Sequence, residues 1–184
     1  MYQYEIRIPK ERIAVLIGTK GKVKKQIEAA TCSKLDVDSK EGDVFISGKD
    51  SVGLVCSKDI INAIGRGFNP DVAMRLLKQD YCFESVDITD FAKNANDIPR
   101  VRGRVIGTGG KSRAKIEELT DTNISVYGKT VSIIGQIDNV AIAKEAIEML
   151  LNGSPHSKVY SKLERKKKEN FRKNILGTER VRDG

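Results

Sequence analysis

The chain has 184 residues, a formal net charge of +8 and a sequence pI near 9.4. This basic balance favours a polyanionic partner, most simply nucleic acid, and the lack of a long apolar run argues against a transmembrane helix. Cys32, Cys56 and Cys82 form neither a disulfide framework nor a paired metal site, and no signal-peptide pattern is present, so we expect a cytoplasmic protein without metal or other cofactor.

The first third of the chain predicts a compact alternation of strands and helices. We expect a strand at 2–8, a helix at 10–17, a helix from Gly21, strands at 34–38 and 43–47, and a helix at 52–64. Asp50 is placed to cap that last helix. Its buried stripe is expected to consist of Val52, Val55, Cys56, Ile60 and Ala63.

The next segment starts with helix breakers and then repeats the same kinds of element. We expect a short helix from Pro70 to Lys78, a strand from Cys82 to Phe91, strands at 123–127 and 130–134, and a helix at 139–151 capped by Asp138. No long flexible linker separates the two halves, so they are expected to pack together.

The end of the chain differs in charge from the rest. Residues 152–184 hold ten Lys or Arg and four acids, which is +6 of the total +8. Val159, Leu163, Phe171 and Ile175 can share one helix face. The tail is either a solvated charged helix or a basic arm that contacts RNA without reading sequence, and we favour the arm. His156 is expected in a loop, without a catalytic role.

An internal repeat organises the chain. The segment "VLIGTKGKVKKQIEAAT" starting at Val15 aligns with "RVIGTGGKSRAKIEELT" starting at Arg104, at a constant offset of 89 residues. Each copy gives the order strand, helix, Gly-x-x-Gly, helix, strand, strand, helix. The sequence therefore predicts an α+β fold built from two copies of one unit.

The Gly-x-x-Gly turns carry the functional argument. Glycine lets the backbone approach a ligand closely, the following helix start supplies amide donors and positive dipole, and Lys22 and Lys111 add charge. A lone Gly-x-x-Gly is usually only structural, but the repeat and the lysines favour a phosphate cradle. Apolar side chains beside each turn would seat unstacked bases. These are Ile17, Ile27, Leu35 and Val37 in the first copy, and Ile106, Ile116, Ile124 and Val126 in the second.

Both copies resemble KH domains of type I, whose fingerprint is read here as "LIGTKGKVKKQI" and "VIGTGGKSRAKI". The resemblance implies a β-α-α-β-β-α fold that clamps about four nucleotides of a single strand. It implies two type I KH domains in tandem, at 1–67 and 81–153, with a short helical linker at 68–80 and a basic C-terminal helical tail at 154–184.

A narrower resemblance rests on "GFNPDVAMRLL", "ESVDI" and "RVRGRVIGTGGKSRAKIEELT". These segments are similar to the partner-of-Nob family of small-subunit ribosome biogenesis factors. The resemblance implies a non-enzymatic factor that binds single-stranded small-subunit rRNA near its 3′ end and assists its maturation. It also implies a PIN-domain endonuclease and the alpha subunit of archaeal translation initiation factor two as partners.

The candidate RNA-binding residues surround the two turns, and no catalytic or metal-binding residue is expected. They are Gly18, Thr19, Lys20, Gly21, Lys22 and Lys25 in the first copy, and Arg102, Arg104, Ile106, Gly107, Thr108, Gly109, Gly110, Lys111 and Arg113 in the second. We expect the second copy to be the main site, with Arg100, Arg102 and Arg104 approaching its turn from one side. In the alternative, one copy is a protein-interaction scaffold that links the endonuclease or the initiation factor to the pre-ribosome.

Overall fold

The computed structural model describes residues 1–182, with side chains described through Leu176. The last residues of the expected tail, 183–184, lie outside this range. The first unit contains β1 (Tyr2–Arg7), α1 (Lys10–Ile17), the 3-10 turn η1 (Thr19–Gly21), α2 (Lys22–Thr31), β2 (Ser33–Val37), β3 (Asp43–Gly48) and α3 (Ser51–Gly65). A linker follows, made of α4 (Pro70–Ala73) and η2 (Met74–Leu77).

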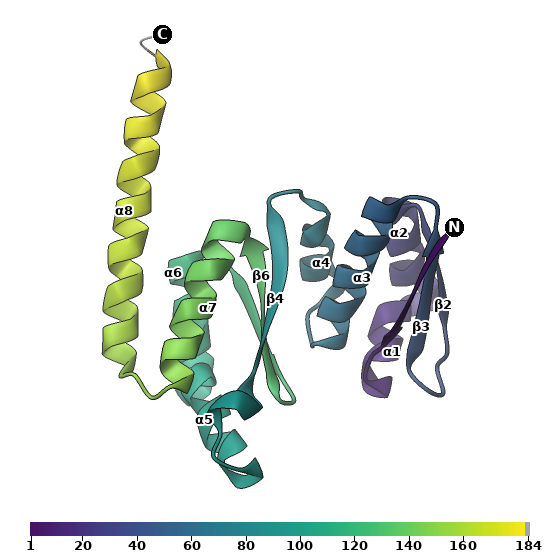
Figure 1. Ribbon diagram of the computed structural model, residues 1–184, viewed down its shortest axis with the longest axis horizontal. Helices are drawn as coiled ribbons and strands as arrows, with labels where there is room; N and C mark the ends of the chain where they lie inside the picture. Colours follow the sequence, from purple (N-terminus) through teal and green to yellow (C-terminus); the bar gives the residue numbers. More distant parts are fainter. Residues whose placement is uncertain (183–184) are drawn as a thin grey trace.

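The second unit repeats this order, and Figure 1 shows the two units side by side. It contains β4 (Tyr81–Asp87), η3 (Ile88–Phe91), η4 (Ala95–Asp97), α5 (Ile98–Ile106), η5 (Thr108–Gly110), α6 (Lys111–Thr120), β5 (Asn123–Tyr127), β6 (Thr130–Gln136) and α7 (Ile137–Leu151). The chain ends in α8 (His156–Arg182). The predicted α+β class and tandem repeat are confirmed.

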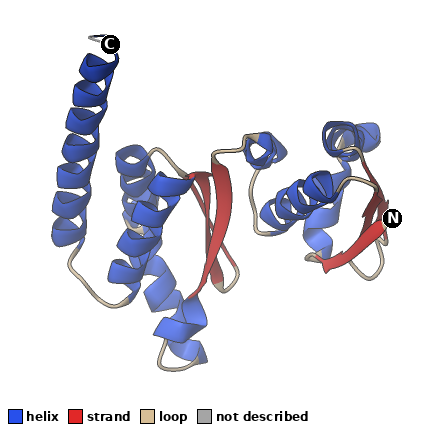
Figure 2. Ribbon diagram, turned by 45° about the horizontal axis from the view of Figure 1, so that its top comes forward, coloured by secondary structure: helices blue, strands red, loops and turns tan. Residues whose placement is uncertain are grey.

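Each unit holds one antiparallel sheet of three strands, with the orders β1-β3-β2 and β4-β6-β5. In both sheets the third strand of the unit is central, so each sheet has its first strand at one edge and its second at the other. Figure 2 shows the two sheets as separate bodies with helices between them. Because side chains alternate across a strand, each sheet offers one face to its own three helices and a second face to whatever lies outside.

Three local predictions need correction. The strand expected to run to Phe91 ends at Asp87, because the Asp87 side chain accepts a hydrogen bond from the Thr89 amide and starts η3. Asp138 does not cap α7, which begins at Ile137 after Gln136 without a side-chain cap. The predicted loop around His156 is instead the first turn of α8. By contrast, Asp50 caps α3 as predicted and accepts from the amides of Val52 and Gly53.

The predicted stripe of α3 is only half right. Ile60 and Ala63 are fully buried, but Val52 is 70% exposed and Val55 is 47% exposed. Leu54, Ile61 and Ile64 form the rest of the buried face instead. Because α3 is buried on two sides, against its own sheet and against the linker, a single apolar stripe could not describe it.

The linker does not hold the two units apart as a flexible spacer; its side chains pack between them. Phe68, Leu76 and Ala73 belong to the first core, and that core also contains Ile134 from β6 of the second unit. The Phe68 and Phe83 rings meet edge to face with centroids 6.4 Å apart. The outer face of the second sheet is therefore covered by the linker and its surroundings, as Figure 1 shows for α4 beside β4.

Polar contacts reinforce this junction. The Arg75 guanidinium donates to the Asn123 side-chain oxygen at 2.8 Å, and the Ser125 hydroxyl donates to the Arg66 carbonyl at 2.8 Å. Tyr127 donates to the Glu11 carboxylate. Both Asn123 and Ser125 come from β5, so one edge of the second sheet is bonded to the linker region.

Helix α8 packs through its first half and then rises away from the body (Figure 1). Val159 and Leu163 are buried in the second core, whereas Phe171 is 67% exposed and Ile175 is 45% exposed. Lys162 and Lys166 bind the Glu145 carboxylate of α7, and Lys167 donates to the Glu118 carbonyl of α6 at 3.2 Å. We therefore propose that the second folded unit extends past residue 153 into the first turns of α8.

Candidate nucleic-acid interface

The first glycine of each turn has a backbone that only glycine adopts readily. Gly18 has φ 69° and ψ 175°, and Gly107 has φ 72° and ψ 175°. A Cβ atom at Gly18 would lie 2.5 Å from the Val23 side chain, and one at Gly107 would lie 2.6 Å from the Ser112 Cβ. These glycines therefore let the end of one helix turn directly onto the start of the next.

The remaining turn positions are left-handed but open. Gly21 and Gly110 have φ values of 73° and 75°, and a Cβ atom at either would meet nothing within 4 Å. Between the glycines, Lys20 has φ 54° and Gly109 has φ 60°. A lysine in this conformation costs of the order of 1 kcal/mol relative to glycine. The first turn therefore carries a charge together with backbone strain, and the second carries neither.

Amide donors and cations meet at the outer side of both turns. Helices α2 and α6 start immediately after the turns, and neither has a side-chain cap. Amides in the first turn of a helix lack intrahelical acceptors, and the helix dipole makes this end positive. Thr19, Lys22, Thr108 and Lys111 are at least partly exposed here. The arrangement suits a phosphate passing across the turn.

Only part of the predicted apolar groove is accessible. Ile27, Leu35, Ile116 and Ile124 are between 0% and 4% exposed, so they belong to the two cores and were wrongly placed in a base-binding groove. Ile17 and Val37 in the first copy, and Ile106 and Val126 in the second, are half-buried. Of the eight side chains predicted to form the groove, these four keep some exposure to solvent.

The three arginines before the second turn do not act together. Arg100 pairs with Asp97 at 2.6 Å, and this hydrogen bond holds the pKa of Asp97 at about 2. Arg102 donates to the Gly128 carbonyl at 3.4 Å, near the turn between β5 and β6. The expectation that all three approach the turn from one side is wrong for Arg102, because residues two apart on a helix face different directions, whereas Arg100 and Arg104, four apart, both line a groove beside the turn.

Arg104 binds the end of α7. Its Nε donates to the Leu150 carbonyl at 2.8 Å, and its Nη2 donates to the Ser154 carbonyl at 2.7 Å. In the first unit, Arg12 binds Ile64 and Phe68 in the same way, at 2.8 and 2.9 Å. Arginine near a helix C-terminus stabilises its free carbonyls. Arg104 therefore has a structural role, and a direct RNA contact by it stays a prediction.

The other predicted cations are exposed on the turns or on the helices after them. Lys20 and Lys25 belong to the first copy, and Arg113 belongs to the second. Sequence reasoning missed two side chains of α8, His156 and Tyr160, which the fold brings beside the second turn. A signal was present, since Val159 and Leu163 predicted an amphipathic helix, but its partner surface could not be read from the repeat.

Among the side chains that the structure describes, residues 1–176, no group of three or more His, Cys, Asp or Glu is arranged to hold a metal ion. Over the same part of the chain, no helix combines the length and apolar character that crossing a membrane requires.

Comparisons with known proteins agree with the two-unit fold. A KH-domain model matches residues 3–63, and a model described as a eukaryotic-type, type I KH domain, from the second domain of PNO1, matches residues 82–168. A KH domain-containing protein of Methanocaldococcus jannaschii is 50% identical over 168 residues, covering 89% of this chain and 74% of its own. The RNA-binding protein pno1 of Dictyostelium discoideum is 31% identical, covering 86% of this chain and 69% of its own.

The chain belongs to the PNO1/Dim2 family of tandem KH proteins. The family includes Dim2p of Pyrococcus horikoshii, whose crystal structure with a/eIF2alpha and rRNA is similar to this chain at a TM-score of 0.84 and 47% identity. That match covers 91% of this chain and 95% of Dim2p. The chain spans about half the length of some eukaryotic members, such as 50% of the pre-rRNA-processing protein PNO1 of Yarrowia lipolytica.

Proposed function

We propose that this protein binds single-stranded small-subunit rRNA near its 3′ end and assists its maturation without catalysing a reaction. The observation that supports this most directly is the pair of Gly-x-x-Gly turns, each with a glycine-only bend, an uncapped helix start and a lysine at its outer side. The P. horikoshii relative forms a complex with rRNA, which supports RNA as the polyanion.

The proposed mechanism is retention of the strand rather than chemistry. Backbone amides at the start of α6 bind a phosphate, Lys111 and Arg113 attract the strand, and Ile106 and Val126 contact unstacked bases. Because the bases are read only when unpaired, binding would keep the rRNA end single-stranded. An accessible single strand is what an endonuclease needs in order to trim it.

Two protein partners belong to the same proposal. The P. horikoshii complex contains a/eIF2alpha beside Dim2p and rRNA, which supports the alpha subunit of the initiation factor as a partner of this chain. Relatives described as pre-rRNA-processing proteins support cooperation with a PIN-domain endonuclease that makes the cut. We place this activity inside the cell, where rRNA is processed, and we propose the cytoplasm as the compartment.

The test is a fluorescence anisotropy titration of a labelled single strand that copies a small-subunit rRNA 3′ end. Thr108→Asp/Gly109→Asp puts two carboxylates into the second turn, at exposed positions that touch no core. Thr19→Asp/Lys20→Asp is the corresponding change in the first turn, and it alters the net charge by −3 rather than −2 because it also removes the Lys20 cation. We expect the second-turn variant to lose at least about ten-fold in affinity, and the affinity of the wild type to fall as salt rises. Unchanged binding by both folded variants would refute the proposal.

One observation favours a protein-docking role for the first unit as a second candidate. Val52 and Val55 of α3 are exposed, and α3 packs beside the edge strand β1, where Tyr2 is 59% exposed. At the matching place on α7 the second unit has Asp138 and Ala141. Valines and a tyrosine on an exposed edge are typical of a protein contact, whereas RNA-binding surfaces are richer in cations.

The docking role predicts a separation of effects. Val52→Asp/Val55→Asp should weaken binding to purified initiation factor alpha subunit and leave RNA affinity unchanged. If the first turn binds RNA, Thr19→Asp/Lys20→Asp should lower the RNA affinity and leave binding of the alpha subunit unchanged. If the valine variant binds the alpha subunit as tightly as the wild type, this face is not the docking site for that partner.

A further inference from the structure

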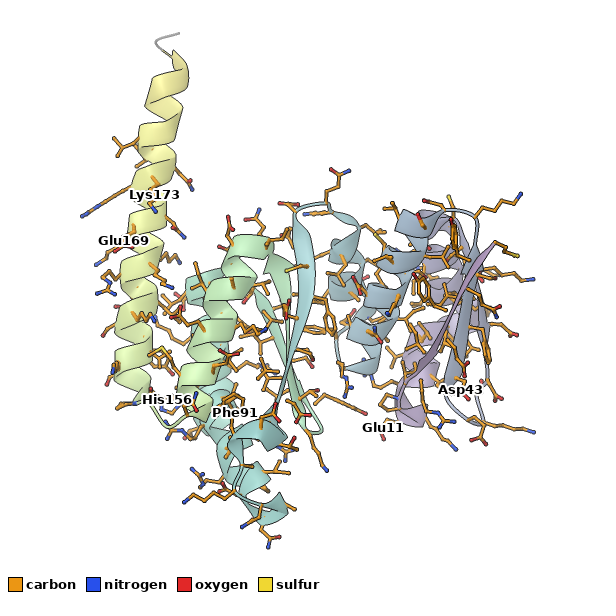
Figure 3. All side chains as sticks on the ribbon, viewed as in Figure 1. Glu11, Asp43, Phe91, His156, Glu169 and Lys173 are labelled. Atoms are coloured by element: carbon orange, nitrogen blue, oxygen red, sulfur yellow. The ribbon has the colours of Figure 1, made fainter. Side chains whose placement is uncertain are left out.

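The second turn borders a groove on the side away from the predicted base-binding surface. Its walls come from α5, the start of α6 and the start of α8, and no residue of β5 lines it. Gly107, Thr108 and Lys111 form one side, and His156 and Tyr160 form the other. The groove has a volume of about 470 Å³ and is open to solvent. Figure 3 places His156 at the base of α8.

The walls combine cations with aromatic rings. Arg100 and Lys111 are exposed, and the half-buried Tyr160 ring lies 6.1 Å from the His156 ring, centroid to centroid. His156 Nε2 is 2.8 Å from the Arg104 carbonyl oxygen. Since a carbonyl only accepts, Nε2 carries a proton, and Nδ1 of the neutral ring remains an acceptor. The groove thus offers positive charge, a flat ring and a hydrogen-bond acceptor.

A buried hydroxyl in the groove wall also lacks a partner. Ser112 is 3% exposed and lines the groove, and its Oγ has no hydrogen-bond partner among the described residues. Buried polar atoms normally have one, and an exception at a groove is a place for a ligand or water to bind. The first copy has Val23 at the same position and therefore carries no such hydroxyl.

The groove depends on α8, and the first unit has no counterpart to that helix. After α3 the chain turns into α4, which packs on α3 and leads into the second sheet. After α7 it turns back into α8, which packs on α6 and α7. The second turn therefore has α8 beside it, whereas the first turn has no matching helix.

We propose that the α8 groove is a second RNA subsite, which holds a nucleotide adjacent in the strand to those gripped by the turn. Lys111 would neutralise its phosphate, since Arg100 is already paired with Asp97, and its base would stack on the exposed face of Tyr160. The subsite rests on the proposed RNA-binding function, because the strand must first cross the turn to reach it. It extends the length of RNA bound by the second unit without requiring the first.

The test compares RNAs of different length on the full chain. One is a four-nucleotide strand from the rRNA 3′ end, and two are eight-nucleotide strands that extend it by four residues at the 5′ or the 3′ side. The variant is Tyr160→Leu, which keeps apolar packing and removes the ring. Tyr160→Phe restores the ring, Phe171→Leu on the exposed part of α8 is the matched control, and Thr108→Asp/Gly109→Asp reports on the turn itself.

We expect Tyr160→Leu to weaken one of the two extended strands by about ten-fold, the effect of losing one base–aromatic stack, and to leave the four-nucleotide strand unchanged. Tyr160→Phe and Phe171→Leu should bind all strands like the wild type. Equal loss for short and extended strands would mean that Tyr160 only positions α8, which overturns the subsite. No loss for any strand overturns it too, while loss in the turn variant would still uphold RNA binding at the turn.

Discussion

The two units share one repeat, yet the second is enclosed on more sides than the first. In the second sheet, Val131, Ser132, Ile133 and Ile134 are all fully buried, so both faces of β6 are covered. In the first sheet, β3 alternates between buried Val44 and Ile46 and half-buried Phe45, as expected for a sheet with one open face. The difference comes from the linker, which packs on the outer face of the second sheet, and it shows that equal sequence units need not offer equal surfaces.

The two Gly-x-x-Gly turns also differ in sequence and in what they pack against. The second has glycine at the left-handed middle position and a serine beneath it, whereas the first has Lys20 and Val23. The second turn is thus relaxed and bordered by polar groups, and the first is strained, charged and packed on an apolar side chain. We expect these differences to affect both stability and binding.

The largest effect is expected at the first glycine of each turn. Gly18→Ala and Gly107→Ala place a Cβ in a glycine-only conformation and against the next helix, so each should lower the free energy of unfolding by about 2–4 kcal/mol. Gly107→Ala should cost more, because its Cβ would also lie 2.8 Å from the Ser112 backbone nitrogen, compared with 3.0 Å for Val23. Urea denaturation checks this, and Gly103→Ala, in open space within α5, is the control.

The next largest effect is expected for Arg104 and Arg12, which we call the arginine clamps because each binds two carbonyls at or after the end of its unit's last helix. Arg104→Ala and Arg12→Ala each remove two hydrogen bonds to carbonyls at or after the end of the unit's last helix, and we expect a loss of about 1–3 kcal/mol in each case. Arg102→Ala, which removes one long bond to Gly128, should cost under about 0.5 kcal/mol. Similar thermal melts for Arg104→Ala and Arg102→Ala would show that the clamp contributes nothing.

Exchanging the middle residues of the turns should have a smaller effect. Lys20→Gly relieves the left-handed lysine but makes the unfolded chain more flexible, so a gain of no more than about 1 kcal/mol is expected. Gly109→Lys should lose a similar amount. Because the two changes move one cation between the turns, the salt dependence of RNA binding should become shallower for Lys20→Gly and steeper for Gly109→Lys. A steeper slope for Lys20→Gly, or a shallower one for Gly109→Lys, would contradict a phosphate contact at that turn.

The smallest effect concerns the docking of α8 at acidic pH. Hydrogen bonds from Lys162 and Lys166 hold the pKa of Glu145 at about 2, below its ordinary 4.5. A lowered folded-state pKa stabilises the fold above pH 4.5, and this contribution is lost as the pH falls toward 2. The three side chains are 30–46% exposed to solvent, so less than about 1 kcal/mol is involved. At pH 6 the wild type should have a higher melting temperature than Glu145→Gln, and this difference should vanish near pH 2. A difference in melting temperature that does not change with pH would exclude the Glu145 carboxylate as its source.

Much of the fold could be predicted because the repeat and the period of apolar residues are local signals. Asp50, the two turns and both central strands follow from neighbouring residues alone. The surface environment could not be predicted in the same way. Ile27 and Leu35 look like groove residues in a pattern but are core residues once the sheet closes, and Arg104 looks like a phosphate ligand but binds the end of α7.

The residues of the site could likewise be predicted only where their role depends on neighbouring residues in the chain. Gly18 and Gly107 could be placed at the turns because their role depends on residues within one turn of helix. His156 and Tyr160 reach the second turn only because Val159 and Leu163 fix α8 on the second core, and all four lie far beyond the turn in the chain. Such long-range packing is decided by which surfaces remain uncovered, and no periodic pattern records that.

The packed linker has a consequence for any strand that touches both units. Because Phe68, Leu76 and Ile134 share one core, the two turns are carried on a single rigid frame rather than on a tether. A strand held at one turn would then meet the other at a set spacing, and binding at the second would act like binding at a high local concentration. The affinity would then depend on RNA length. RNAs shorter than the distance between the two turns would bind through one turn, and RNAs long enough to reach both would bind far more tightly.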